Sequence, residues 1–431
     1  MRILLILALL LSAPVANAQV DVYLADLEAL RTFLEKTPSY RTQIRGSKLS
    51  AYNELYGQLA ADTSADLSSY EQFCRLSKLL SPIRDNHLSL YQTPQFHHFK
   101  DSVSTNNYVA SEEFQHYPRV ELNVDSLKSV LLQKPTDSVE GIYHFGKSYR
   151  VGLFRRSDKE YLGVVLDSDV KVWQKGQIAV RLYQTGLGTF KAVYGHPAYK
   201  YFILQNNEKL RNQTLLNSQF YAFGALNQYT KHQHQTDYIN IPGTSRFELK
   251  SVADDVQYLL IRSFQVNSAT RQQSQAFYES IKDSLTADNL ILDLRNNEGG
   301  APKEMLKYYK LLREYSRKGN LYVLLNNGTL SQAEIFTLKL QKLKNTTTAG
   351  QTTKGMLSYG SNYGKREKLP SGQFVLYITD TKNKRAFLKY EERGIDPAIE
   401  LLPDADWTDQ ILERIKGRKP VVSSENRPEK G

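Results

Sequence analysis

Residues 293–300 could take part in acyl transfer. They read DLRNNEGG, so an apolar strand runs into the paired glycines Gly299 and Gly300 just ahead of Pro302, where a helix is expected to begin. Glycine lets backbone N–H groups face a ligand without a Cβ in the way, and such donors can stabilise negative charge developing on a carbonyl oxygen. We interpret this turn as a candidate oxyanion hole, with an ordinary tight turn as the alternative.

Ser331 lies in a second such segment, residues 326–334, between an apolar strand and a helix. Ser331 and Glu334 form the Ser-x-x-Glu pattern of a helix capping box, which is the structural interpretation of this motif. A serine at a strand-to-helix turn, close to a helix N-terminus that stabilises negative charge, is also typical of nucleophilic serines. The two interpretations are compatible, so Ser331 is a candidate nucleophile.

Both segments belong to a region in which strands alternate with helices. Alternation of this kind predicts a mostly parallel sheet with ligands at the carboxyl ends of its strands. The expected strands are 258–264, 290–294, 321–325 and 374–379, and the expected helices lie near 272–285, 303–315 and 331–343.

The rest of the chain has a different pattern of apolar residues. Apolar residues recur at helical spacing up to about residue 91, and short alternating strands follow between about 139 and 201. The fold class predicted is therefore α/β, with the β-rich part a sandwich or a barrel. The predicted ranges are a signal peptide (1–18), a helical domain (19–105), a β-rich domain (106–245), a catalytic α/β core (246–415) and a disordered tail (416–431).

Composition and the N-terminal segment limit the classes of function that the chain can have. The 431-residue chain opens with a positive start, an apolar run over 3–13 and an A-x-A pattern ending at Ala18, which predicts an exported, secreted or periplasmic protein. No later run reaches membrane-spanning length. The net charge of +11 is scattered along the chain and does not predict a nucleic-acid partner. Cys74 is the single cysteine, so no intramolecular disulfide is expected.

Four motifs occur in order and together resemble a known family. They are LDLRNNEGG (292–300), TLSQAEIF (329–336), AGQTTKG (349–355) and EERGIDP (391–397). Over about 257–403 the chain resembles the tail-specific, or C-terminal processing, serine peptidases, which include the tricorn core proteases. The resemblance implies a crotonase-like fold for this core.

The resemblance also implies roles for individual residues. Ser331 would be the nucleophile, and the backbone N–H of Gly299, together with that of Gln332, would form the oxyanion hole. In the C-terminal processing branch a lysine about 25 residues after the serine activates it. In this chain that position is occupied by Met356, and Lys354 lies two residues before it. Lys354 is therefore one candidate base.

The tricorn-like branch implies a different base. There a histidine from the preceding region takes the proton and a glutamate near the last motif orients it, which corresponds to His87 and Glu391. Asn86 stands where that branch has a serine beside the histidine. We favour His87, because its ordinary pKa of about 6.5 suits proton transfer at neutral pH, whereas Lys354 would need a pKa lowered from about 10.4.

The predicted function is thus a serine peptidase that hydrolyses peptides or unfolded protein chains through an acyl-enzyme, without a cofactor or metal. The alternative is a catalytically silent protein whose cleft binds peptides or hydrophobic ligands. A third interpretation is a glycan-binding envelope protein that uses the β-rich domain. Substrate preference and oligomeric state stay open.

Overall fold

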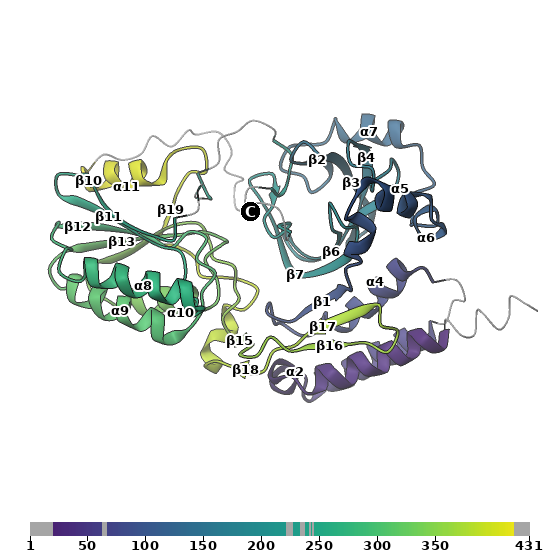
Figure 1. Cartoon of the computed structure of the whole chain (residues 1–431), viewed down its shortest axis with the longest axis horizontal. Coiled ribbons are helices and arrows are strands. Elements are labelled where there is room, and N and C mark those ends of the chain that lie inside the picture. Colours follow the sequence, from purple (N-terminus) through teal and green to yellow (C-terminus); the bar gives the residue numbers. More distant parts are fainter. Residues whose placement is uncertain are drawn as a thin grey trace, which may run out of the picture. The chain divides into compact units, whose positions relative to one another are not determined.

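The computed structural model describes residues 20–62, 67–220, 227–232, 238–240, 243 and 245–417. The chain forms two compact units (Figure 1). Unit 1 comprises residues 1–234 and 358–392, and unit 2 comprises residues 235–357 and 393–431. The predicted signal peptide, and the predicted tail from residue 418 onward, lie outside the described residues.

Helices occupy the N-terminal part of unit 1. In α4 the side chain of Ser68 accepts a hydrogen bond from the Glu71 N–H, which caps the helix. Phe73 and Leu76 follow at helical spacing and are buried in the core of the unit. The helical segments are 20–35, α2 (Pro38–Gln43), α3 (Ser47–Ala61), α4 (Ser69–Leu79), η1 (Phe96–Phe99), α5 (Ser102–Ala110), α6 (Glu112–Gln115), α7 (Val124–Leu131) and η2 (Arg385–Lys389).

An antiparallel sheet fills the rest of unit 1. Within the described residues its order is β16-β17-β1-β7-β6-β5-β4-β3-β2-β9-β8, and β8 also pairs with β7, so the strands from β7 to β8 close into a ring. Closure removes exposed strand edges, and the β-rich part is therefore a barrel rather than a sandwich. The strands are β1 (Ser89–Gln92), β2 (Gly141–Phe145), β3 (Tyr149–Ser157), β4 (Glu160–Ser168), β5 (Ile178–Gly186), β6 (Thr189–Gly195), β7 (Phe202–Arg211), β8 (Thr214–Leu215), β9 (Tyr229–Thr230), β16 (Arg366–Lys368) and β17 (Phe374–Tyr377), with β15 (Tyr359–Gly360) and β18 (Thr381–Lys382) as a separate pair.

Unit 2 is built on a six-stranded sheet of order β10-β11-β12-β13-β14-β19. All its pairs are parallel except the hairpin of β10 with β11. The elements are β10 (Phe247–Ala253), β11 (Val256–Ile261), α8 (Ser268–Ile281), β12 (Asn289–Asp293), α9 (Pro302–Tyr315), β13 (Asn320–Leu325), α10 (Gln332–Leu340), β14 (Thr346–Gly350), β19 (Ile399–Glu400) and α11 (Trp407–Ile415).

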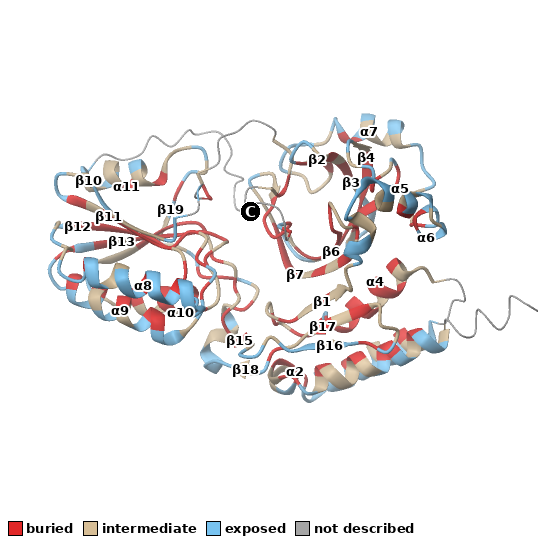
Figure 2. Ribbon diagram, in the orientation of Figure 1, coloured by how far each residue is buried: buried red, intermediate tan, exposed pale blue. Residues whose placement is uncertain are grey.

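Helices cover both faces of the unit 2 sheet. Helices α8, α9 and α10 lie on one face and α11 on the other (Figure 1), and a separate hydrophobic core fills each interface. All five residues of β12 are buried, as expected for a central parallel strand (Figure 2). The predicted α/β class is confirmed, and the carboxyl ends of β12, β13 and β14 meet at one edge of the sheet.

The predicted strand 374–379 is the element that sequence reasoning placed wrongly. The sequence pattern assigns it to the parallel sheet, but β17 pairs antiparallel with β1 in unit 1, with Gln92 opposite Phe374. A run of alternating apolar residues fixes a strand but not its partner, because pairing over nearly 300 residues leaves no local signal.

The two units also divide the chain differently from the predicted domain ranges. The helical and β-rich segments form one unit with a shared hydrophobic core, and residues 358–392 join it through β17. The chain therefore passes between the units at 234/235, 357/358 and 392/393. Among the described helices, none combines the length and apolarity that a membrane span needs.

Replacing Phe374 with alanine should destabilise unit 1 by about 3–5 kcal/mol, because its buried ring packs on Phe73 with a centroid separation of 5.6 Å. Chemical unfolding followed by fluorescence measures the change. Tyr363→Ala is the control, since that ring is 88% exposed and should change stability by less than about 0.5 kcal/mol. Equal effects of the two variants would contradict the placement of β17 in this core.

Candidate active site

Ser331 lies in the turn between β13 and α10, as the N-cap residue of the helix. Its backbone has φ 56° and ψ −119°, which is uncommon and strained for a residue with a side chain. Sharp strand-to-helix turns of this kind are typical of nucleophilic serines, because they expose the hydroxyl at the end of the sheet. Ser331 is half-buried, so the hydroxyl lies in a region only partly open to water.

The carboxylate of Glu334 holds this turn. It is fully buried and accepts four hydrogen bonds, which compensate for the loss of hydration of a buried charge. Its Oε2 accepts from the N–H groups of Ser331 (3.1 Å) and Met356 (2.8 Å). Its Oε1 accepts from the hydroxyl of Thr353 (2.6 Å) and the N–H of Gly355 (2.8 Å). Glu334 thus ties the serine turn to the loop after β14.

Gly299 packs directly against the serine turn. A Cβ built on it would lie 2.7 Å from the Gln332 nitrogen, 2.9 Å from the Leu330 oxygen and 3.0 Å from the Ser331 Cβ. Its φ of +80° is also one that residues with side chains rarely adopt. Only glycine fits here, and the structure therefore brings the two sequence motifs together.

The backbone donors at this turn differ in availability. The Gly299 N–H donates to Oδ1 of Asn297 (2.9 Å), whose amide group in turn donates to the Ile261 carbonyl (2.8 Å). The N–H groups of Gly300 and Gln332 make no hydrogen bond with any residue that the structure describes. Gln332 is the first residue of α10, where N–H groups lack an acceptor within the helix. Its N–H is therefore better placed than that of Gly299 to receive an oxyanion.

Lys354, the alternative base, belongs to the loop that Glu334 holds. Its backbone N–H donates to the carbonyl of Thr329 (3.2 Å), two residues before Ser331, and the residue is half-buried. Met356, at the offset where the related enzymes carry lysine, contributes its backbone N–H to Glu334 instead. The structure thus brings the Lys354 backbone close to the serine turn.

The first motif also carries a structural ion pair. Asp293, at the end of β12, is fully buried and accepts from the Arg295 guanidinium at 2.6 Å and from the Tyr258 hydroxyl at 2.9 Å. The Arg295 guanidinium lies 4.9 Å from the centroid of the Trp407 ring. These contacts fix where the strand ends and the glycine turn begins.

The third and fourth motifs pack on each other inside unit 2. The Thr353 hydroxyl accepts from the Ile395 N–H (2.8 Å), while the Thr353 N–H donates to the Ile395 carbonyl (3.1 Å). A Cβ on Gly394 would lie 2.1 Å from the Thr353 carbonyl oxygen. The glycine of the last motif is thus required by close backbone contact, which positions the loop that binds Glu334.

His87 lies in unit 1, in the turn before β1. Its N–H donates to Oδ1 of the buried Asp85 (3.1 Å), and the other oxygen of Asp85 accepts from the Thr379 hydroxyl (2.7 Å). Burial raises the pKa of Asp85 to about 6, against the opposing effect of hydrogen bonds from Thr379, Ser39, His87 and Leu88. Asp85 therefore fixes the backbone of the histidine turn.

Glu391, the candidate orienting residue, is also in unit 1 and fully buried. One oxygen accepts from the N–H of Asn86, next to His87, and the other from the N–H of Ser358, each at 2.8 Å. Arg84 donates to the Glu391 carbonyl and pairs with Glu392 (3.5 Å). The structure thus brings Glu391 to the histidine turn through the Asn86 backbone.

The sequence-predicted residues therefore fall into two groups. Ser331, Gly299, Gly300 and Lys354 come together in unit 2, and His87 and Glu391 come together in unit 1. Within the described residues no group of three or more histidine, cysteine, aspartate or glutamate side chains is placed to hold a metal ion.

Sequence reasoning missed several residues that shape the site. The sequence pattern indicates Glu334 only as a helix cap, and it gives no individual role to Asn297 or Thr353. Asn326 was also overlooked: it is buried, and its Oδ1 accepts from the N–H groups of Asn296 (2.9 Å) and Gly328 (3.0 Å), joining the two turns. Asparagine directly after a strand, two residues before a glycine, was an available turn signal.

A serine at a sharp strand-to-helix turn is an arrangement that hydrolases use for their nucleophile. Residues 255–317 and 307–401 match the model of peptidase family S41. Over these residues the chain is similar to that family, and the predicted class of enzyme, a serine-type peptidase, is confirmed.

Among curated proteins, none matches this chain. Solved structures that resemble it include a putative peptidase from Parabacteroides merdae ATCC 43184 (TM-score 0.37, 14% identity, covering 91% of this chain and 92% of the other). The photosystem II D1 C-terminal processing protease (0.34, 16%, 89% and 93%) and mature CPAF (0.42, 10%, 92% and 96%) are further examples.

Glu334→Gln should lower kcat for peptide hydrolysis by about ten- to a hundredfold while KM changes little. The amide keeps the size of the side chain, but its NH2 group cannot accept the hydrogen bonds that the Ser331 N–H or the Thr353 hydroxyl donates to Glu334. The donor left without an acceptor moves, which shifts the Ser331 turn. Steady-state kinetics on a fluorogenic peptide measures the effect. Glu298→Gln, an exposed carboxylate in the neighbouring turn, is the matched control. A Glu334→Gln enzyme with unchanged kcat would refute the positioning role.

Because of Asp85, the free energy of unfolding should fall as pH rises from about 4 to 6. Its folded pKa of about 6 lies above the ordinary value of 3.8, so the folded state binds this proton more tightly than the unfolded state. The stabilisation is complete below pH 4 and is lost as pH rises through 6, by about 3 kcal/mol in total. Denaturant unfolding of the wild type and of Asp85→Asn should be measured from pH 4 to 7. Over this range the free energy of unfolding of the wild type should fall by about 3 kcal/mol relative to that of the variant. A constant difference across that range would contradict the account.

Proposed function

We propose that this chain is an exported peptidase that hydrolyses peptides or unfolded protein chains through an acyl-enzyme on Ser331, with His87 as the base. The observation that carries the proposal is the strained Ser331 turn at the start of α10, fixed by Glu334. Export rests on the N-terminal sequence pattern alone.

In the first step His87 takes the hydroxyl proton of Ser331 while Oγ attacks the peptide carbonyl carbon. The charge that develops on the carbonyl oxygen is stabilised by the Gln332 N–H at the N-terminus of α10, assisted by the Gly300 N–H. Protonated His87 then gives its proton to the leaving amine, and the acyl group stays on Ser331.

In the second step His87 takes a proton from water, whose oxygen attacks the acyl carbon. His87 then returns this proton to Oγ of Ser331 as the acyl–Oγ bond breaks, which releases the carboxylate product and restores both residues. The Glu391 carboxylate supports this cycle by fixing the backbone of the histidine turn at Asn86. Asp85 holds the same turn from its other side, through the His87 N–H. Both are positioning residues in this mechanism.

The test is cleavage of a mixed peptide library, read by mass spectrometry, by the wild type and its variants. Ser331→Ala should lose at least a factor of about a thousand in rate, and His87→Ala a comparable amount, because nucleophile and base act as one unit. Lys354→Ala should keep most activity. His97→Ala, which removes an exposed histidine, is the control for a general effect of losing an imidazole.

Two results would overturn parts of this proposal. Full activity of Ser331→Ala would remove the nucleophile assignment. Loss of activity in Lys354→Ala together with an active His87→Ala would establish a serine–lysine dyad in place of His87.

A further inference from the structure

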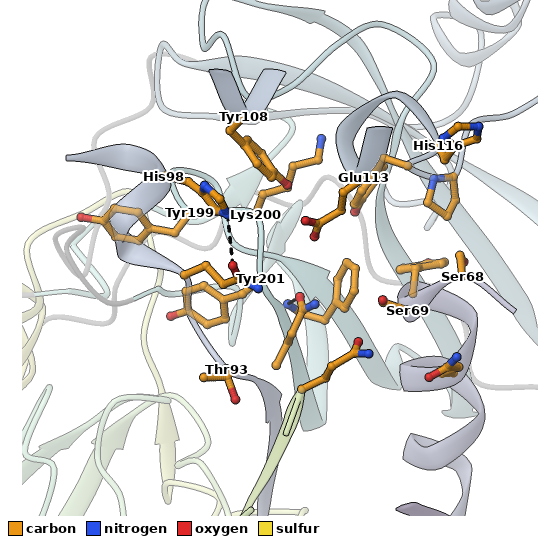
Figure 3. Close-up of a pocket in the computed structure, with 18 of the residues that line it drawn as sticks. Ser68, Ser69, Thr93, His98, Tyr108, Glu113, His116, Tyr199, Lys200 and Tyr201 are labelled. Carbon is orange, nitrogen blue, oxygen red and sulfur yellow. Dashed lines mark hydrogen bonds between the residues drawn. The ribbon is translucent and has the colours of Figure 1, made fainter. Parts of the chain in front are cut away.

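Unit 1 contains a cavity of about 490 Å³ that the mechanism does not use (Figure 3). Its walls come from the start of α4, from η1, from α5 and α6, and from the link between β6 and β7. The volume lies in the range typical of sites for small ligands or single side chains. None of its lining residues belongs to the unit that carries Ser331.

Aromatic rings form two walls of the cavity. In one wall Tyr108 stacks on His98 (centroids 4.9 Å apart) and meets Phe99 edge-on (5.2 Å). In the other wall Tyr70 packs edge-on against Phe202 (5.3 Å). These contacts fix the rings in place before any ligand arrives, so little conformational entropy is lost on binding.

Glu113 supplies the negative charge of the cavity. It is the single carboxylate among the lining residues, it is exposed, and its carboxylate is directed into the cavity (Figure 3). It forms no ion pair or side-chain hydrogen bond with any residue in the described part of the chain. A carboxylate beside fixed tyrosine faces is a combination that attracts cations.

The positive groups nearby do not neutralise Glu113 within the cavity. The Lys200 ammonium is buried, donates to the Val172 carbonyl (2.8 Å) and to Gln177, and lies 3.9 Å from the centroid of the Tyr117 ring. Burial lowers the pKa of Lys200 well below its ordinary value, and burial likewise lowers that of His98. The Lys200 ammonium is thus held by its own acceptors and by the Tyr117 ring, and Glu113 supplies the carboxylate that a ligand meets in the cavity.

We propose that this cavity binds the cationic side chain of a peptide, lysine or arginine, and so acts as a second recognition site for substrates. The alkyl part of either side chain would pack along the rings, and its charged end would meet Glu113 and the aromatic faces. The inference rests on the proposed function in one respect: the peptide that binds here is taken to be a substrate.

The test is a binding measurement that needs no catalysis. Fluorescence anisotropy with the full-length Ser331→Ala protein would compare a labelled peptide carrying one arginine with the same peptide carrying citrulline, its neutral isostere. The arginine peptide should bind more tightly, and Glu113→Gln should weaken its binding about fivefold. Glu112→Gln, the exposed neighbour that does not line the cavity, should leave binding unchanged.

Equal affinity for the arginine and citrulline peptides, or no difference between Glu113→Gln and Glu112→Gln, would overturn the inference. Binding of a neutral oligosaccharide that competes with the peptide and ignores Glu113→Gln would assign the cavity to glycans and overturn it as well. The proposed function fails separately, if the wild type cuts no peptide while Glu113-dependent binding persists.

Discussion

The unit 2 site depends on the hydrogen bonds that the buried carboxylate of Glu334 accepts. A charge with no access to water is stable only when donors surround it, and Glu334 has four, drawn from the serine turn and the loop after β14. Moving either segment would leave a buried charge short of donors. That requirement is what maintains the strained backbone of Ser331, which by itself is less stable than an ordinary helix start.

Close backbone contacts complete the constraint. Gly299 and Gly394 each lie where a side chain would collide with a neighbouring turn, so the four motifs are joined through glycine positions as much as through polar side chains. The parallel sheet supplies the common origin, because β12, β13 and β14 end at one edge and their loops must meet there. The position of the Ser331 turn is thus set by the order of the strands.

Much of unit 2 could be predicted from the sequence, because its strands and helices alternate with clear periodicity and its motifs follow strands. The partners of single residues could not be predicted. Ser-x-x-Glu indicated a cap at Ser331, but only the fold shows that Glu334 also binds the loop at Thr353. Likewise the apolar alternation around Phe374 predicted a strand, while its pairing with β1 depends on contacts between distant parts of the chain. The aromatic cavity could not be predicted from the sequence for the same reason, since its rings come from segments far apart along the chain.

In the proposed mechanism Ser331 is a nucleophile activated by His87. The most direct measurement is the rate of covalent labelling by a fluorophosphonate, with the modified residue located by peptide mass spectrometry. The account predicts a single label on Ser331, formed at least about a hundredfold more slowly in His87→Gln. Labelling of another residue, or a Ser331 rate unaffected by the loss of His87, would contradict it.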